Sequence, residues 1–244
     1  HVGSRIAHHL AEWSGHRLSW EFQKHQNEKA TEPVSVPDAL RRAFLRLQKD
    51  YADALINDGS RKLSEAHAEA AADVTRSSAP AIAAASNKHD WRAGASAILA
   101  YVVDHTLYVA NAGDALAVMS RNGGTAHLIS NKHEPFDRAE IERIRSAEGW
   151  VSLRGYVNDM LDVSRSFGYF HLFPIVNAAP AVTTVQLTDS DEFVIIANRT
   201  LWQYVSYQTA VDIARTQRND PMIAAQKLRD FAISYGAEES IMVM

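Results

Sequence analysis

Apolar residues follow a helical period near the start of the chain. Val2, Ile6, Leu10 and Trp13 alternate with polar residues, which predicts an amphipathic helix that ends near Gly15. The polar stretch 23–37 holds two prolines and predicts a loop. A second helix is predicted over residues 39–56, with Asp38 at its N-cap and large apolar residues on one face: Leu40, Phe44, Leu47, Tyr51 and Leu55.

The middle of the chain changes to the pattern of strands. Runs of β-branched and apolar residues cover 95–104, 106–112 and 115–120, and short turn sequences separate them. This pattern predicts an antiparallel meander with tight turns. Further strands are predicted over 181–187, 193–197 and 241–244. The run 193–197 is continuously apolar, which is typical of a strand buried on both faces, and it ends in the polar pair Asn198-Arg199.

Three shorter helices complete the pattern, over residues 138–148, 207–216 and 221–235. The last begins with Pro221, a residue that suits the first turn of a helix. Helices come first, strands follow, and helices and a strand close the chain. That order predicts an α+β layered domain and not an alternating βαβ fold. Residues 57–90 hold few large apolar groups, so we expect a flexible insertion there, although its alanine-rich parts are compatible with helix.

Composition narrows the class of protein. The 244 residues are 46% apolar and 22% charged, as in a soluble globular protein, with a net charge of -4 that gives no reason to expect nucleic acid as a partner. The chain has no cysteine, which excludes a disulfide framework and a thiolate metal site and fits a cytoplasmic location. No apolar run approaches about 20 residues, so no transmembrane segment is expected.

Five segments, in the family's order, resemble the metal-dependent protein phosphatases of the PP2C (PPM) type. The fourth, for example, is similar to the family pattern VNGxLAVSRAFGD, and the fifth to DEFLILASDGLWD. The segments are Leu107–Asp114, Leu128–Pro135, Glu140–Val151, Val157–Tyr169 and Asp191–Gln203. The resemblance implies a single PP2C-like domain over residues 1–244, folded as a four-layer α-β-β-α sandwich of two antiparallel sheets. His1–Ala7 is similar to the continuation of the family's Asp-Gly-His motif, so we expect the first strands of the domain to precede His1.

In that family two Mg²⁺ or Mn²⁺ ions lie between the sheets, held by aspartates, and a metal-bound hydroxide attacks the phosphate. The resemblance places three vestigial metal positions in this chain. Asp114 keeps its acid, Arg199 stands where the family has an aspartate, and Glu239 stands at the late acidic position. Tyr169 and Gln203 replace two further aspartates. A guanidinium has only donors and cannot ligate a cation.

Each of these residues also has a plainer interpretation. Asp114 follows a glycine, and aspartate is favoured in turns whether or not a metal is bound. Arg199 either pairs with Glu239 or Asp114 and fills the old metal site, or turns to solvent. Glu239 is compatible with a surface acid. We therefore assign no catalytic residue, no confident metal ligand and no cofactor to this segment. Mg²⁺ or Mn²⁺ is expected only if the chain is an active phosphatase.

The amino-acid sequence of residues 193–215 and 220–244 resembles the degenerate PP2C segment of fungal adenylate cyclases. The resemblance implies a pseudophosphatase module that regulates or scaffolds signalling, in a parent protein that makes cyclic AMP from ATP. Its partners would be protein partners or neighbouring domains of the parent, with peripheral membrane contact only through that parent. Two alternatives are an active Mg²⁺/Mn²⁺-dependent serine/threonine phosphatase and a non-catalytic protein-interaction domain of another signalling protein.

Overall fold

Two antiparallel sheets form the centre of the chain in the computed structural model, which describes residues 35–72 and 90–244. The first sheet has the order β2-β3-β7, with β2 at Ala97–Val103, β3 at Thr106–Ala112 and β7 at Ala181–Gln186. The second has the order β5-β4-β8, with β5 at Thr125–Leu128, β4 at Leu116–Arg121 and β8 at Asp191–Ala197. The three predicted strands are confirmed, but they do not form one meander: β2 and β3 pair as a hairpin, whereas β4 crosses to the second sheet and pairs with β5 and β8. The pattern shows where the strands lie but does not show which of them pair, and it did not predict β5.

The two sheets pack face to face because each strand alternates its side chains. Leu107 and Val109 of β3 meet Ala117 and Met119 of β4 in a buried apolar layer between the sheets. The intervening residues, such as Val118 of β4, point to the outer faces. This inner layer is the core of the sandwich.

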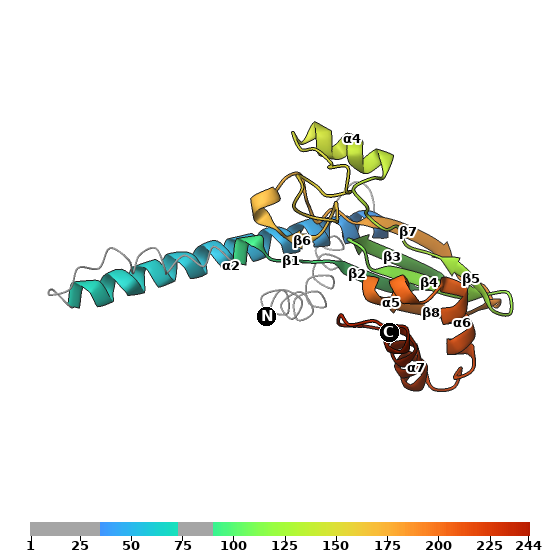
Figure 1. Ribbon diagram of the computed structural model, residues 1–244. Coiled ribbons are helices and arrows are strands. Elements are labelled where there is room, and N and C mark those ends of the chain that lie inside the picture. The colour runs from blue at the N-terminus through green and yellow to red at the C-terminus, as the bar shows by residue number, and fades with distance from the viewer. Residues whose placement is uncertain (1–34, 73–89) are drawn as a thin grey trace.

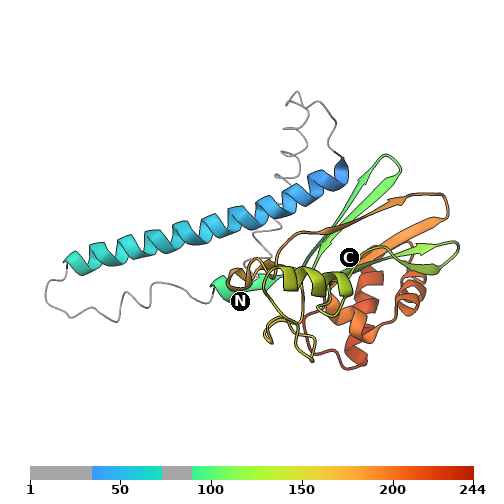
Figure 2. The same ribbon diagram turned by 90° about the horizontal axis from the view of Figure 1, so that it is seen from above.

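Helices cover both outer faces (Figure 1, Figure 2). On the β2-β3-β7 side, α2 (Val36–Ala72) buries Leu40, Phe44 and Leu47 against that sheet. The β5-β4-β8 sheet is covered by three helices, α5 (Arg199–Tyr204), α6 (Tyr207–Arg215) and α7 (Pro221–Ser234). The resulting order is helix, sheet, sheet, helices, which confirms the predicted four-layer α-β-β-α fold class.

The helix α2 continues to Ala72, past its predicted end at residue 56 and into the segment where a flexible insertion was expected. Alanine and glutamate are frequent between residues 57 and 72, and both favour helix. The remaining part of that segment, residues 73–89, lies outside the described residues. So do the helix predicted over residues 2–13 and most of the loop predicted over 23–37.

A smaller unit lies beside the sandwich and borders its polar end. It contains α4 (Arg138–Ser146), the loop 149–166, the short strands β1 (Gly94–Ala95) and β6 (Phe167–Gly168), and the 3-10 turns η1 (Asp90–Arg92) and η2 (Phe170–Leu172). Ile144 of α4 is fully buried against Val157, Leu172 and Val176. Figure 1 shows α4 standing away from the sheets, so this unit is an addition to the four layers and not a fifth layer.

The strand β8 has both faces covered, as its apolar run predicted. Ile195 and Ala197 face the helices, while Val194 and Ile196 face the layer between the sheets. The predicted final strand is observed as a short extension, in which the amide of Ile196 donates to the carbonyl of Met244 and the amide of Met244 donates to the carbonyl of Ile196, both at 2.8 Å. At its other end β8 passes directly into α5, so Arg199 is the first residue of a helix.

Candidate functional site

A polar pocket of about 250 Å³ opens at the end of the sandwich where β3, β8 and the smaller unit meet. Three segments that are far apart in the sequence supply the charged side chains that meet at its centre. Asp114 comes from the turn between β3 and β4, Asp162 from the end of the loop of the smaller unit, and Arg199 from the start of α5. This convergence makes the pocket the candidate functional site.

The turn that carries Asp114 is fixed from two sides. Gly113 has φ +122°, and a Cβ at this position would lie 2.1 Å from the hydroxyl oxygen of Ser96, so the turn requires glycine. The Ser96 hydroxyl donates to Asp114 Oδ1 at 2.7 Å, and the Asp114 amide donates back to it at 3.3 Å. Asp114 is therefore a turn residue, as its plainer interpretation has it, and also a positioned carboxylate.

Two buried side chains hold the same turn from behind. The amide of Asn111 donates to the carbonyl oxygens of Gly113, Ala115 and Asn131 at 3.2, 2.9 and 2.7 Å. The Gly113 amide donates to Nδ1 of His133 at 3.2 Å. Burial, together with the charge of nearby Arg165, lowers the pKa of His133 to about 4, so this imidazole is neutral at neutral pH and accepts that hydrogen bond.

Asp162 and Arg199 are also held in place, because the residues next to them in the sequence are packed. Asp162 lies between Leu161, which packs in the core of the smaller unit, and Val163, which is buried. Arg199 is followed by Thr200 and Leu201, which are the buried residues of α5. The backbone therefore points each charged side chain toward the pocket.

Arg199 joins the two acids. Its guanidinium forms a close ion pair with Asp162 and a second one with Asp114 at 3.7 Å. The side chain of Asp114 is 16% exposed, while Asp162 and Arg199 are 37% and 39% exposed. The hydrogen bond to Asp162 raises the pKa of Arg199, partial burial opposes it, and Asp114 and Glu239 add to the increase. The arginine is charged at every physiological pH.

The rim of the pocket adds cations and aromatic rings. Lys132 pairs closely with Glu134, whereas Arg154 is exposed and has no ion pair with any residue that the structure describes. Phe136 and Tyr156 also line the opening, and the Phe136 ring covers Gly155 so closely that a Cβ there would lie 2.7 Å away.

The predicted site residues are thus only partly brought together. Asp114 and Arg199 meet, and Glu239 is exposed and acts on Arg199 only through space. Tyr169 is half-buried near the acids: burial, then the charges of Asp162 and Asp114, raise its pKa. Asp162 was missed by the sequence analysis. The signal was there, because the family pattern has alanine where this chain has Asp162.

The donor set does not fit a divalent-metal centre. Such ions require several oxygen ligands, and here the carboxylates of Asp114 and Asp162 already share a guanidinium, which offers no lone pair. Within residues 35–72 and 90–244, no three His, Cys, Asp or Glu side chains are grouped so that they could hold a metal ion. The positive charge between the two acids of the pocket is accordingly that of Arg199.

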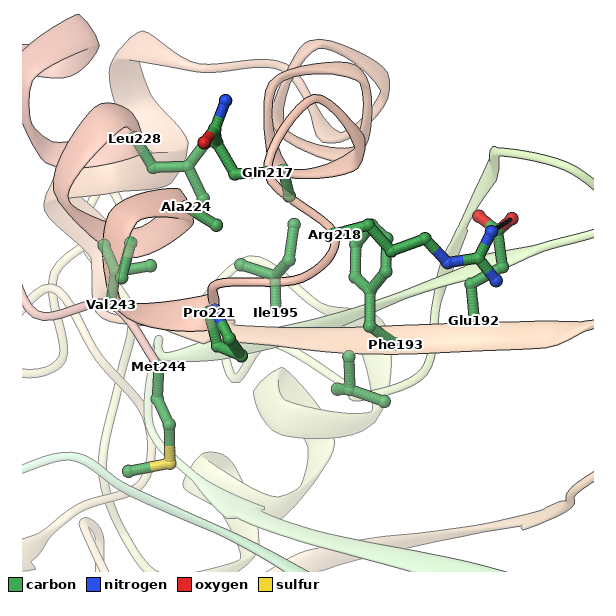
Figure 3. Close-up of a pocket in the computed structure, with 13 residues that line it drawn as sticks. Glu192, Phe193, Ile195, Gln217, Arg218, Pro221, Ala224, Leu228, Val243 and Met244 are labelled. Atoms are coloured by element: carbon green, nitrogen blue, oxygen red, sulfur yellow. Dashed lines mark ion pairs between the residues drawn. The ribbon is translucent and has the colours of Figure 1, made fainter.

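A second cleft, of about 110 Å³, lies between β8 and the helices α6 and α7 (Figure 3). Its walls are mainly apolar, from residues such as Ile195, Ala224 and Leu228. At one end Arg218 and Glu192 form an ion pair at 3.4 Å, and Met244 lies at the other end (Figure 3). Apart from the Arg218–Glu192 pair and Gln217 its lining offers no group for chemistry, so it is secondary to the polar pocket.

Comparisons with known proteins agree with the resemblance to the PP2C family. The family model described as "PP2C: Protein phosphatase 2C" matches residues 1–241. An adenylate cyclase of Mycosarcoma maydis is 98% identical over 244 residues, which is 100% of this chain and 10% of that protein. An adenylate cyclase of Neurospora crassa is 38% identical over 242 residues, 99% of this chain and 10% of that protein. The chain thus spans about a tenth of the length of these relatives.

Solved structures resemble the chain in fold. A sex determining protein of C. elegans superposes with a TM-score of 0.68 at 17% identity, over 93% of this chain and 50% of that chain. A serine-threonine phosphatase 2C from Toxoplasma gondii gives a TM-score of 0.63 at 17% identity, over 91% of this chain and 73% of that chain. At such low identity these likenesses bear on the sandwich alone.

Among the helices that the structure describes, none is both long and apolar enough to cross a membrane.

Proposed function

The chain belongs to the protein phosphatase 2C family, and from this premise we propose that it is a regulatory module without phosphatase activity inside an adenylate cyclase. The observation that carries the proposal is the position of Arg199. Its guanidinium lies between the carboxylates of Asp114 and Asp162, in the pocket where the resemblance to active phosphatases puts the metal ions.

The chemistry of phosphoester hydrolysis supports this proposal. Metal-assisted hydrolysis depends on a cation with an open coordination position, which lowers the pKa of a bound water and neutralises the developing charge. A guanidinium supplies positive charge but cannot bind or ionise a water as a Lewis acid. A metal would have to displace Arg199 from both acids and would still lack the carboxylate that the family has at this position.

The relatives support the second half of the proposal. Both adenylate cyclases match nearly the whole chain, and the chain fills about a tenth of each. In such a parent, cyclic AMP would be formed from ATP by another part of the protein. This segment would act through contacts with neighbouring domains or with protein partners, in the cytoplasm or at a membrane surface that the parent reaches.

The first test is hydrolysis. The chain, and the whole Mycosarcoma maydis relative, are incubated with p-nitrophenyl phosphate or a phosphothreonine peptide in millimolar Mn²⁺ or Mg²⁺. We expect no phosphate release above that of the same samples in EDTA. Turnover by the wild-type chain that EDTA abolishes would favour an active phosphatase and contradict the proposal.

The second test is regulation. In the Mycosarcoma maydis relative, deletion of the corresponding segment should change the rate of cyclic AMP formation, since the segment would influence its neighbours and not the cyclase chemistry itself. Expression and Kd for ATP are measured in parallel, so that a loss of folding is recognised. An unchanged rate in a folded deletion variant would leave the module without a regulatory role.

A further inference from the structure

We propose that Arg199 is an internal counter-ion that replaces a bound cation: it ties together the three segments of the polar pocket and makes their folded arrangement independent of divalent metal. The inference concerns folding and cation binding, and goes beyond the regulatory role proposed above. It also implies that Asp114 and Asp162 form a cation site, and that the cation in this site is the Arg199 side chain of the same chain.

The geometry shows why a tie is needed. Asp114 is fixed to Ser96 and the turn after β3, and Asp162 is fixed to the loop of the smaller unit. Arg199 is fixed to the end of β8. Each charged side chain is thus anchored within its own segment, while the backbone of His133 links the turn of Asp114 to the loop of Asp162 by hydrogen bonds to Gly113 and Ser164 at 3.0 and 3.2 Å. The ion pairs of Arg199 are the contacts by which these anchored groups meet across the pocket.

The charges show why the tie is a cation. Two carboxylates that converge on one point repel each other unless positive charge lies between them. The same guanidinium nitrogen, Nη1, pairs with both acids, and a guanidinium is more weakly hydrated than a lysine ammonium, so it suits a partly buried position between two carboxylates.

Arg199 is also in an unfavourable place by itself. It stands in the first turn of α5, where the helix dipole disfavours a cation, and that turn has no acid of its own. Asn198, the N-cap residue, does not cap the helix with its side chain, which instead donates to the carbonyl of Ser240 at 2.7 Å. The acids that offset the misplaced charge are therefore Asp114 and Asp162, from other segments.

Partial exposure limits the size of the effect. Ion pairs whose partners are more than a third exposed are screened by water, so their loss lowers stability modestly. For a chain of this length, we expect the loss of the tie to lower Tm by roughly 2–4 °C. Loss of the guanidinium would also leave two adjacent carboxylates, which are ligands that hard divalent cations prefer.

The test compares melting temperatures of the full chain in EDTA and in millimolar Mn²⁺. The wild-type Tm is expected to be the same in both. Arg199→Ala should melt roughly 2–4 °C lower in EDTA, and Mn²⁺ should restore most of the difference. Arg199→Ala/Asp162→Asn should melt low in both conditions, because one of the two carboxylates is gone.

Two single variants serve as controls. Arg199→Lys retains the charge without the planar fork, so its Tm should lie between wild type and Arg199→Ala. Arg121→Ala removes an arginine from a single carboxylate, Asp191, and its loss of Tm should not be restored by Mn²⁺.

Three results would overturn the inference. A wild-type Tm that rises in Mn²⁺ would show that a metal binds with Arg199 in place. An Arg199→Ala variant with wild-type Tm would show that Arg199 ties nothing together. A lowered Tm that Mn²⁺ does not restore would show that the guanidinium and a bound cation are not equivalent. Phosphatase turnover enters none of these readouts, so failure of the proposed function would be recognised separately.

Discussion

Two clusters of arginine and carboxylate in this chain have opposite proportions. In the first, one acid, Glu140, is 5% exposed and is paired with Arg143 and Arg165. In the second, one cation, Arg199, serves two acids and is 39% exposed. The guanidinium groups of the first cluster also donate to backbone carbonyls, as at Ile175 and Ala179, at 2.7 and 2.9 Å.

The difference shows that the Glu140 cluster has a structural role, whereas the Arg199 cluster belongs to the candidate site. The Glu140 cluster is buried and its donors are used on fixed backbone atoms, so it holds α4 and the loop of the smaller unit in one arrangement. The Arg199 cluster faces a pocket, and among the described residues its guanidinium hydrogen-bonds to the Asp162 side chain and not to the backbone. Substitutions of its side chains should therefore lower stability less than substitutions in the Glu140 cluster.

The largest effect is expected from Glu140→Ala. The substitution leaves two arginines facing each other with no counter-ion, and we expect the free energy of unfolding to fall by about 3 kcal/mol. Urea denaturation measures the loss. The matched control is Glu142→Ala, on the same helix but 66% exposed and paired, among the described residues, with Arg138 alone. This substitution should change the free energy of unfolding little. Equal losses in both would mean that burial does not distinguish the two acids.

The same acid predicts a dependence on pH. Burial by itself would raise the pKa of Glu140, but hydrogen bonds from Arg165 and Arg143 hold it at about 2, against 4.5 for an ordinary glutamate. The folded pKa is depressed, so the stabilisation is present above the unfolded pKa and is lost as pH falls toward about 2, by roughly 2–3 kcal/mol.

That window is measured by comparing wild type with Glu140→Gln at a series of pH values. The difference in unfolding free energy should shrink steadily from about pH 5 to about pH 2, where the wild-type carboxyl also becomes neutral. A difference that is constant over this range would contradict the depressed pKa.

A smaller effect is expected at the second cluster. Asp162→Asn should lower the free energy of unfolding by about 1 kcal/mol or less, because both partners are more than a third exposed. Since charges at exposed sites are screened by salt, the effect should disappear at about 1 M NaCl. The Glu140→Ala loss should persist there. If both losses vanish, or neither does, the two clusters are electrostatically alike.

The smallest effect is expected from Lys132→Ala. Lys132 lines the same pocket, but its ion pair with Glu134 is local and exposed. We expect a change in unfolding free energy within about 0.5 kcal/mol at any salt concentration. A larger loss would mean that Lys132, and not only Arg199, ties the pocket together.

The sequence predicted the layers better than the contacts. Strand β3 and helices α6 and α7 were expected nearly at their observed ends, because alternation and helical period are local signals. Helix α5 was missed, since it is only six residues long and directly follows an apolar strand. Strand β5 was missed because its residues are largely exposed, so its pattern carries little apolar contrast.

The site was half predicted for a comparable reason. Arg199 stood out because it departs from a family motif, and the departure implied a partner. The partner, Asp162, is a departure in another motif, 37 residues away in the chain. Neither motif alone says that the two side chains meet, since that depends on how the smaller unit packs beside β8. The two substitutions, Asp162 and Arg199, are explained only when the two residues are considered together.

The long helix α2 has a practical consequence for all these measurements. Its 37 residues extend about 55 Å, and Figures 1 and 2 show its far half projecting beyond the sheets. The near half is held by apolar packing on the first sheet, whereas the backbone of the far half projects from it, so the far half depends more on local helix propensity. Heating should therefore unwind the helix from its far end before the sandwich opens. Circular dichroism at 222 nm would then record this early fraying, while Trp202, which packs against the core beside the second sheet, would change its fluorescence only when that core is lost.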